Sequence, residues 1–340
     1  MPDLSLDGNV QVQKYEVNWH ESMQQTYEFY VVDPSTWKDT KQLTEVESCS
    51  ITRDASVQTL GSASFDVGES LDECYVRTYL VVIQNGFTSR FPLGTHLLQT
   101  PSAEFNGKQK RYTIDAYTPL MELKESYPPI GYSILKDTKI MPLASNLFRE
   151  HMRAPIVNAK SEEKLYSNFV ANLDDTWLSF LSDLVANAKY EIKLDELGQV
   201  IFEPIVAAES LQPVKEFNDD NSSILLPTLK DDRDLYGIPN VVEVVYSTDK
   251  LHLHSRVVND DPNSPISTVV RGREIVHRDS SPKFSGTPTQ AIIDSYADQL
   301  LKSLSCMEHT VTFTHSYYPV RVGDAVMLNY KKSRLRECYC

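Results

Sequence analysis

The sequence predicts an α+β fold, mainly β, with two small antiparallel β-barrel domains and a helical α+β insert between them. Strands joined by Asn-Gly turns fill residues 75–117, amphipathic helices fill 137–188, and strand-forming segments resume at 241. The expected domains are a first tube-like β-barrel over 1–127, the helical α+β insert over 128–230, and a second tube-like β-barrel with one helix over 231–340. At 340 residues, a division into two or three domains is the ordinary expectation.

The first barrel is centred on a meander of three strands. Residues 75–82 alternate along an extended chain, with one apolar and one mixed face. Asn85-Gly86 follows, and these residues most easily take the positive φ of a tight hairpin turn; Asn106-Gly107 repeats the pattern. Return strands are therefore expected at 95–100 and 111–117, and further strands at 27–32, 45–53 and 59–67. We interpret Trp37 as a packed plug rather than a ligand stack.

The insert begins where the strand pattern ends. Pro119 and Pro128-Pro129 predict a linker over 119–135, because this dipeptide fits neither a helix interior nor a central strand. The first predicted helix runs from Thr138, its expected N-cap, to Met152. The second carries an apolar stripe over Trp177–Ala188, which we interpret as insert core rather than partner surface. Strands at 190–194 and 200–203 flank Asp195–Gly198 as a hairpin.

The second barrel is expected after another crossing segment, 227–239. Its charged run, 230–234, is typical of a solvated turn. A capping box, Thr287-Pro288-Thr289-Gln290, predicts the start of a helix. Strands are expected at 241–246, 251–259, 266–276, 310–317 and 325–330. The barrel would need another strand at its end, so we expect it either to close with few strands or to continue beyond residue 340.

A Gly-centred pattern occurs in both halves of the chain. Residues 91–98 and 320–327 each place an apolar residue, a glycine, two further residues and an apolar pair in the same order. Glycine suits a tight corner before a strand. The pattern favours two barrels of similar build.

The charge balance excludes one broad class of function. The formal net charge is −14, whereas a general nucleic-acid-binding surface needs a positive field. We interpret the net negative charge either as favouring solubility or as forming a negative surface past which DNA slides. No run of 18 apolar residues exists, so no membrane span is expected, and the N-terminus lacks a secretion signal. Five scattered cysteines indicate reduced thiols made in a cytoplasm.

No catalytic signature appears in the sequence. The weak candidates are a metal site at Cys338 and Cys340, a metal site built on His252 and His254 with Glu274 or His277, the isolated His309 and His315, and a carboxylate pair among Asp54, Asp66, Asp72 and Asp115. None has the spacing that its chemistry needs. We therefore expect no enzyme activity, no catalytic, cofactor-binding or metal-binding residues, and no cofactor.

Phrases from about residue 27 to about 330 resemble the tail hub (baseplate hub) proteins of long-tailed bacteriophages and, more distantly, the late-control protein D group of contractile-tail phages. The phrases are YVVDPSTW, CSITRD, ASFDVGE, YVRTYLVV, PLGTHLLQTPSAEFNGK, DAYTPLMELKES with PPIGY, DLYGIPNVVEVVYS, PISTVVRGREIVHRD and PVRVGDAVMLNY. They are diffuse rather than catalytic, so they characterise the family and not single residues.

The resemblance implies a structural virion component at the tail tip, made in the host cytoplasm. It implies a homotrimer in which three chains with two barrels each form a pseudo-six-fold ring. Such a ring would dock onto the distal tail protein ring and present three-fold symmetry to a fibre, spike or enzyme. Its channel would pass the tape-measure protein and then DNA, without specific binding, during DNA ejection.

Two other functions stay open at this point. The first is a tail-associated peptidoglycan hydrolase or peptidase, which would show a convergent Cys/His/Asp or metal cluster in a cleft. The second is a host-carbohydrate binding module, which would show an exposed aromatic shelf built from Tyr317, Tyr318 and Tyr330.

Overall fold

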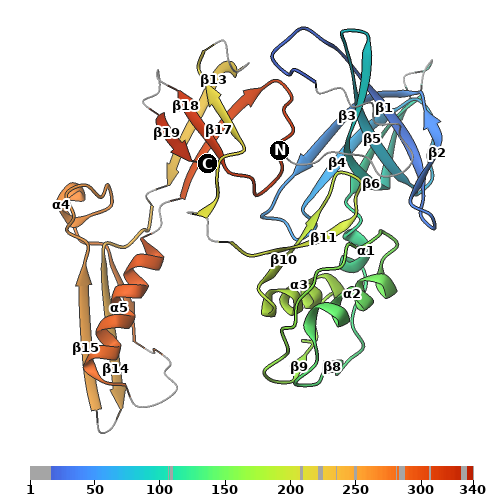
Figure 1. The fold of residues 1–340 in the computed structure, drawn as a ribbon. Helices are drawn as coiled ribbons and strands as arrows, with labels where there is room; N and C mark the ends of the chain where they lie inside the picture. The colour runs from blue at the N-terminus through green and yellow to red at the C-terminus, as the bar shows by residue number, and fades with distance from the viewer. Residues whose placement is uncertain are drawn as a thin grey trace. The chain divides into compact units, whose positions relative to one another are not determined.

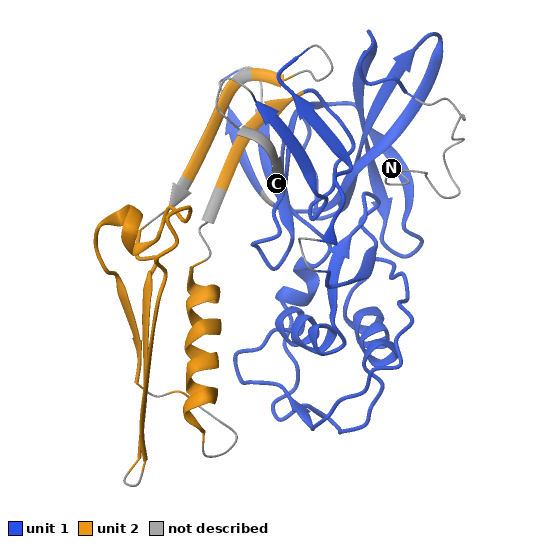
Figure 2. Cartoon of the chain, turned by 60° about the vertical axis from the view of Figure 1, so that its left-hand side comes forward, with its two compact units in different colours: residues 1–224, 316–340 blue, residues 225–315 orange. Residues whose placement is uncertain are grey.

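The computed structural model describes residues 17–105, 107, 110–206, 210–220, 225–234, 236–248, 251–280, 282, 288–305, 308–330 and 335–339. The fold is α+β and mainly β, as predicted (Figure 1). The chain divides into two compact units (Figure 2). Unit 1 comprises 1–224 and 316–340, and unit 2 comprises 225–315. The sequence predicts three domains with boundaries at 127/128 and 230/231. The division into two compact units does not test those boundaries, so they stay a prediction.

Unit 1 contains a seven-stranded antiparallel sheet in the order β2-β1-β5-β6-β7-β4-β3. The strands are β1 (Gln24–Asp33), β2 (Lys38–Leu43), β3 (Val46–Arg53), β4 (Gly61–Val67), β5 (Tyr75–Gln84), β6 (Phe87–Phe105) and β7 (Lys110–Tyr117). Strands β2 and β3 form the two edges, and no pairing joins them within the described residues. Closure of this sheet into a barrel therefore stays a prediction.

The hairpin between β5 and β6 has the predicted turn chemistry. Asn85 and Gly86 have φ values of 52° and 81°, the pair of positive angles that a type I′ turn requires. Asn106, in the second predicted turn, lies outside the described residues. Strand β5 differs from its expected amphipathic pattern: both of its faces are buried, including Arg77 and Thr78. The reason is its position between β1 and β6, with packed side chains on either face.

The insert consists of short helices and hairpins. Its elements are α1 (Met121–Lys124), β8 (Ser133–Ile134), α2 (Ile140–His151), β9 (Phe169–Val170), α3 (Trp177–Asn187), β10 (Tyr190–Leu194) and β11 (Val200–Pro204). Two details of the prediction are wrong. The expected linker contains α1, because fully buried Leu120 and Leu123 hold this single turn against the core. Thr138 does not cap α2, which begins after Lys139; the Thr138 hydroxyl donates to the Leu135 carbonyl at 2.7 Å.

One hydrophobic core joins the insert to the first sheet. The apolar stripe of α3 is buried, with Leu181 and Leu184 fully inaccessible, which confirms that it is core. The same cluster includes Trp37, Tyr75 and Leu97 from the sheet. The insert therefore depends on the sheet for part of its packing.

The C-terminal segment returns to unit 1. Strand β12 (Lys215–Asn218) pairs in parallel with β18 (Val326–Tyr330), which pairs with β19 (Leu335–Tyr339). Just before β18, the Tyr317 ring lies 5.2 Å from that of Trp19, which in turn lies 5.1 Å from Phe91 on β6. Aromatic packing thus connects residue 317 to the first sheet.

Unit 2 contains a helix packed on a small sheet. Its elements are β13 (Leu225–Asp234), β14 (Val241–Thr248), β15 (Leu251–Val258), α4 (Thr268–Arg271), β16 (Val276–Asp279), α5 (Gln290–Leu304) and β17 (Glu308–His315). The sheet order is β15-β14-β16, and β13 pairs separately with β17. Helix α5 buries Ile293 and Ala297 against Val242 and Val244 of β14. No helix in the described part of either unit is long and apolar enough to cross a membrane.

Three predictions in unit 2 are wrong. The charged run 230–234 is not a turn but part of β13, whose backbone is paired with β17. Residues 266–276 are not a strand: they contain α4, which Ser267 caps by accepting from the Val270 amide at 3.2 Å. Helix α5 begins at Gln290 after Thr289, two residues later than the predicted capping box placed it; Thr287 lies outside the described residues.

The two Gly-centred segments have different local structures. Residues 91–98 lie within β6, where the register against β5 shifts beside Gly94. Val320 to Asp324 instead forms a loop before β18, with Gly323 at φ 90°. These segments therefore give the two-barrel prediction no local support.

Candidate functional site

Among the described side chains, the residues singled out as weak metal ligands do not converge. His252 and His254 are exposed on β15, and a hydrogen bond of 2.7 Å joins the His252 Nδ1 to the Ser247 hydroxyl. Glu274 instead pairs with Arg256 at 2.7 Å. Across the described ranges, no group of three or more His, Cys, Asp or Glu side chains could hold a metal ion. Cys340 lies outside the described residues, and so do the side chains of Cys338 and His309.

The four aspartates are distributed over turns and strands of the first sheet. Asp54 accepts from the amide and the hydroxyl of Ser56. Asp66 accepts from the hydroxyls of Ser48 and Thr113, and these bonds lower the pKa of its carboxyl. Both carboxyls therefore have local structural partners, and nothing arranges them as an acid–base pair.

The predicted aromatic shelf is not exposed. Tyr317 is half-buried beside Trp19, and burial raises its pKa to about 12. The Lys215 ammonium lies 4.7 Å from the centre of the Tyr318 ring. Tyr330 is half-buried within β18. These rings do not form the flat open surface on which a sugar would stack.

The structure instead builds a polar junction that sequence analysis missed, at the turn between β10 and β11. The Leu197 carbonyl in this turn accepts from the Trp37 indole at 2.8 Å, the Thr95 hydroxyl at 2.9 Å and the Arg77 Nη2 at 3.2 Å. Gly198 follows at φ 76°, and a Cβ there would lie 2.8 Å from the Thr95 Cβ. The hairpin tip is therefore held directly against the first sheet, and Trp37 is packed, as expected.

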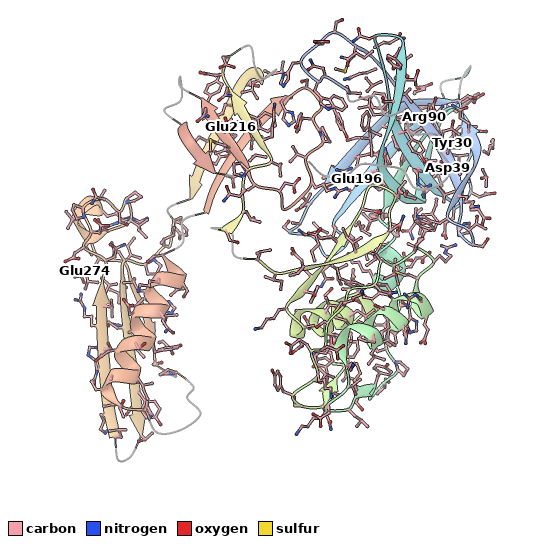
Figure 3. All side chains as sticks on the ribbon, viewed as in Figure 1. Tyr30, Asp39, Arg90, Glu196, Glu216 and Glu274 are labelled. Atoms are coloured by element: carbon pink, nitrogen blue, oxygen red, sulfur yellow. The ribbon has the colours of Figure 1, made fainter. Side chains whose placement is uncertain are left out.

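Arg77 is the buried cation of this junction. Its side chain is only 5% exposed, and its Nη1 donates to the Asp39 carboxylate at 2.7 Å. Asp39, labelled in Figure 3, also accepts from the Tyr79 hydroxyl at 2.6 Å. The Arg77 Nε donates to the Thr95 hydroxyl at 2.9 Å. A charge-assisted network thus satisfies the buried Arg77 guanidinium and the Tyr79 hydroxyl of β5.

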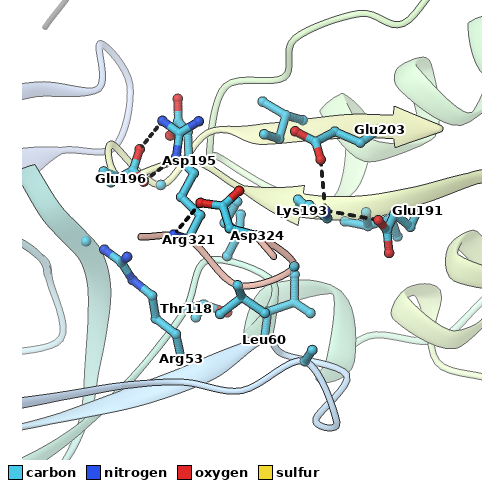
Figure 4. Close-up of a pocket in the computed structure, with 18 of the residues that line it drawn as sticks. Arg53, Leu60, Thr118, Glu191, Lys193, Asp195, Glu196, Glu203, Arg321 and Asp324 are labelled. Carbon is cyan, nitrogen blue, oxygen red and sulfur yellow. Dashed lines mark hydrogen bonds and ion pairs between the residues drawn. The ribbon is translucent and has the colours of Figure 1, made fainter. Parts of the chain in front are cut away.

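A second, partly buried ion pair joins the same turn to the C-terminal segment. Arg321 donates to both carboxylate oxygens of Glu196, at 2.6 and 2.7 Å, in a bidentate pair (Figure 4). The Glu196 side chain is 8% exposed and that of Arg321 is 30% exposed. The Arg321 amide donates to Asp324 at 2.8 Å. Residues 125 positions apart in the sequence are thereby joined in unit 1.

These contacts surround a cavity of about 380 Å³ (Figure 4). Its walls come from the first sheet, the β10–β11 hairpin and the loop before β18. Its apolar lining includes Leu60, Leu93, Ile192, Ile201, Leu211 and Val322. The volume falls in the range of about 300–1,000 Å³ that small-molecule sites occupy. The cavity is therefore the candidate site of the described structure.

Two titratable groups on the cavity wall have shifted pKa values. Burial lowers the pKa of His96 to about 4, with a smaller effect of the Arg53 charge. Burial raises the pKa of Asp195 to about 6, although the amides of Gln199 and Leu197 donate to it. His96 is therefore neutral at pH 7. The Nδ1 of His96 is buried without a hydrogen-bond partner.

The cavity has the volume of a ligand site, and its described lining offers few nucleophiles. None of its lining residues is a serine or cysteine, and the carboxylates of Glu196 and Glu191 are paired with cations. Two sequence signals could have indicated the junction: a charged residue, Arg77, inside an apolar strand, and a Leu-Gly pair in the hairpin turn.

Comparison with known proteins addresses the fold. The sequence matches no protein-family model and no curated protein. The structure is similar to a tail protein from Neisseria meningitidis MC58, with a TM-score of 0.57 and 14% identity over 92% of this chain and 89% of that one. It is also similar to the 43 kDa tail protein of prophage MuSo2 from Shewanella oneidensis, with a TM-score of 0.58 and 9% identity over 92% of this chain and 91% of that one. The chain therefore has the fold of these two tail proteins.

Proposed function

We propose that this protein is a non-enzymatic structural component of a bacteriophage tail, namely the trimeric hub at the tail tip of the virion. The observation that carries the proposal is the fold shared with two phage tail proteins over 92% of the chain. The sequence phrases that resemble tail hub proteins support it independently. The two lines of support differ in kind, because one uses backbone geometry and the other uses residue identities.

In the proposed assembly, each chain contributes two tube-like barrels, formed by residues 1–127 and 231–340, with the insert 128–230 between them. Three chains then place six barrels around a channel. The seven-stranded antiparallel sheet supports the first barrel, since a twisted sheet of this size can curl on itself. The pseudo-six-fold ring would match the distal tail protein ring, and its other side would bind a fibre, spike or enzyme.

The channel would carry the tape-measure protein and then DNA. The net charge of −14 supports a wall that repels phosphate, so that DNA passes without specific binding. The charge of the wall can be read from an experimental structure of the trimer: acidic or neutral side chains are expected along the channel. A channel lined with Lys and Arg would contradict this part of the proposal.

The oligomeric mass tests the hub proposal most directly. Light scattering coupled to size-exclusion chromatography should give three times the chain mass of 38.6 kDa, about 116 kDa. Negative-stain images of the same peak should show a ring with a central opening. A mass of one or two chains at every protein concentration, or compact particles without an opening, would contradict the proposal.

Zymography on host cell walls tests the non-enzymatic part. We expect no clearing by the purified protein under conditions in which a control lysozyme clears. Clearing that persists after repurification would instead support the tail-associated hydrolase.

A further inference from the structure

The cavity of unit 1 lies within one chain, so its use as a binding site does not depend on the proposed trimer. Its walls are fixed on two sides by buried polar contacts: the Leu197 carbonyl against Trp37 and Thr95, and the Glu196–Arg321 pair. A preformed cavity needs little ordering when a ligand enters, which favours binding. At about 30 Å³ for each water molecule, its volume equals that of about a dozen waters.

The cations on the cavity wall differ in whether they already have a carboxylate partner. Lys193 pairs with Glu191 at 3.0 Å and with Glu203 at 2.8 Å. Arg321 pairs with Glu196. Within the described residues, the Arg53 guanidinium donates to the Leu93 carbonyl, and no carboxylate lies within ion-pair distance of it. Arg53 is therefore the cation of the wall that retains capacity for an anion.

His96, which lies close enough to Arg53 to feel its charge, does not add a second positive charge to the wall. His96 is neutral at pH 7, because its pKa lies near 4. The lining also includes apolar side chains, namely Leu60 before β4, Leu93 of β6 and Val322 of the C-terminal loop, and two further carboxylates, Asp195 and Asp324. Figure 4 shows Arg53 and Leu60 on the same side of the cavity, across from the β10–β11 hairpin. A ligand of mixed character fits this lining: an anionic head next to a short apolar body.

We propose that the cavity binds a carboxylate attached to a short apolar group, with the carboxylate on the Arg53 guanidinium and the apolar part against Leu60, Leu93 and Val322. The planar guanidinium donates two parallel hydrogen bonds to a carboxylate, which makes this pairing stronger than one with a neutral amide. Two sources offer this chemistry: the C-terminal end of a polypeptide and a free aliphatic acid.

Calorimetric titration of the full chain with paired probes tests the inference. N-acetyl-leucine represents the polypeptide end and octanoate the free acid; N-acetyl-leucinamide and octanamide are their neutral counterparts. We expect at least one acid to bind about tenfold more tightly than its amide. Tighter binding of N-acetyl-leucine would assign the site to a chain end, and tighter binding of octanoate would assign it to a free acid.

Three variants locate the effect. Arg53→Met should remove the preference for the acid, so that acid and amide bind within about twofold of each other, whereas Arg53→Lys should keep part of it. Arg149→Met is the matched control, because Arg149 is exposed on α2 and bonds only to the amide side chains of Asn146 and Asn158. It should retain the full preference. Arg53 is exposed, so its replacement should leave the tryptophan fluorescence unfolding curve unchanged.

Three results would overturn the inference: no binding of any probe, equal binding of acid and amide to the natural chain, or an acid preference that survives Arg53→Met. None of these depends on oligomeric state. A monomeric protein that shows the Arg53-dependent preference would refute the hub and retain the site, and a trimer without it would do the reverse.

Discussion

Replacement of Arg77 by methionine should destabilise unit 1 strongly. The Arg77 side chain is 5% exposed, and it donates to Asp39, Thr95 and two backbone carbonyls. Methionine keeps much of the aliphatic volume but removes every donor. The variant therefore leaves the Asp39 carboxylate without its cation, in a position where it is only 19% exposed.

The expected cost follows from this burial. Removal of one partner of a buried ion pair costs about 3–5 kcal/mol, because the remaining charge is uncompensated. Asp39 retains the Tyr79 hydroxyl and some solvent contact, so we expect the lower end, about 3 kcal/mol. With an m-value of about 3 kcal/mol/M for a unit of this size, the urea midpoint should fall by about 1 M.

Tryptophan fluorescence during urea unfolding measures the loss of stability of unit 1. The three tryptophans, Trp19, Trp37 and Trp177, all lie in unit 1. The control is Arg90→Met, which removes an exposed ion pair with Glu28 and should cost about 0–1 kcal/mol. Arg77→Met with Asp39→Leu should recover part of the lost stability, because no buried charge then remains unpaired.

Two outcomes would refute this reasoning. If Arg77→Met shifts the midpoint no more than Arg90→Met, the junction does not stabilise unit 1. If the double variant is as unstable as Arg77→Met alone, the loss comes from packing and not from an unpaired carboxylate.

Two further predictions concern pH and backbone strain. The unfolded chain protonates His96 below about pH 6.5 and the folded chain only below about 4, so this group lowers stability by about 3 kcal/mol as the pH falls between these values. Asp195 has the opposite effect, because its folded pKa is about 6 and its ordinary value is 3.8. The decrease in the urea midpoint between pH 7 and pH 4.5 should therefore be larger in Asp195→Asn than in the natural chain, and smaller in His96→Phe. A decrease equal to that of the natural chain in both variants would contradict both assignments. Gly198→Ala should cost about 1–3 kcal/mol by thermal unfolding, because φ is positive and the new Cβ would meet Thr95 at 2.8 Å. Gly131→Ala, with a φ of 79° and no atom within 4 Å, should cost only about 1 kcal/mol; equal costs would show that the Thr95 contact does not matter.

Local patterns were sufficient wherever a structure depends on neighbouring residues. Asn85-Gly86 predicted the β5–β6 turn because positive φ is a property of those two residues themselves. The 3.6-residue periodicity of Trp177–Ala188 predicted α3 and its buried face, which tertiary packing then used. The α+β class could be predicted from such segments, because a period of two residues indicates a strand and a period of 3.6 residues indicates a helix.

Local patterns failed where distant pairing decided the outcome. The run 230–234 has the composition of a turn, yet pairing with β17, about 80 residues later, makes it a strand. Strand β2 had no alternating pattern of its own and forms because β1 is beside it. In both cases backbone hydrogen bonds to a partner strand outweigh the intrinsic preference of the segment.

The sequence by itself determined the class of the fold, most of its strands and longer helices, the absence of a recognisable catalytic motif, and the resemblance to tail hub proteins. Only the tertiary structure decided the junction and its cavity. Glu196 and Arg321 are 125 residues apart, and Trp37 and Leu197 are 160 apart, so no local period relates them. Burial then gives these contacts their strength, because a charge removed from water requires a partner that only the folded chain brings within reach.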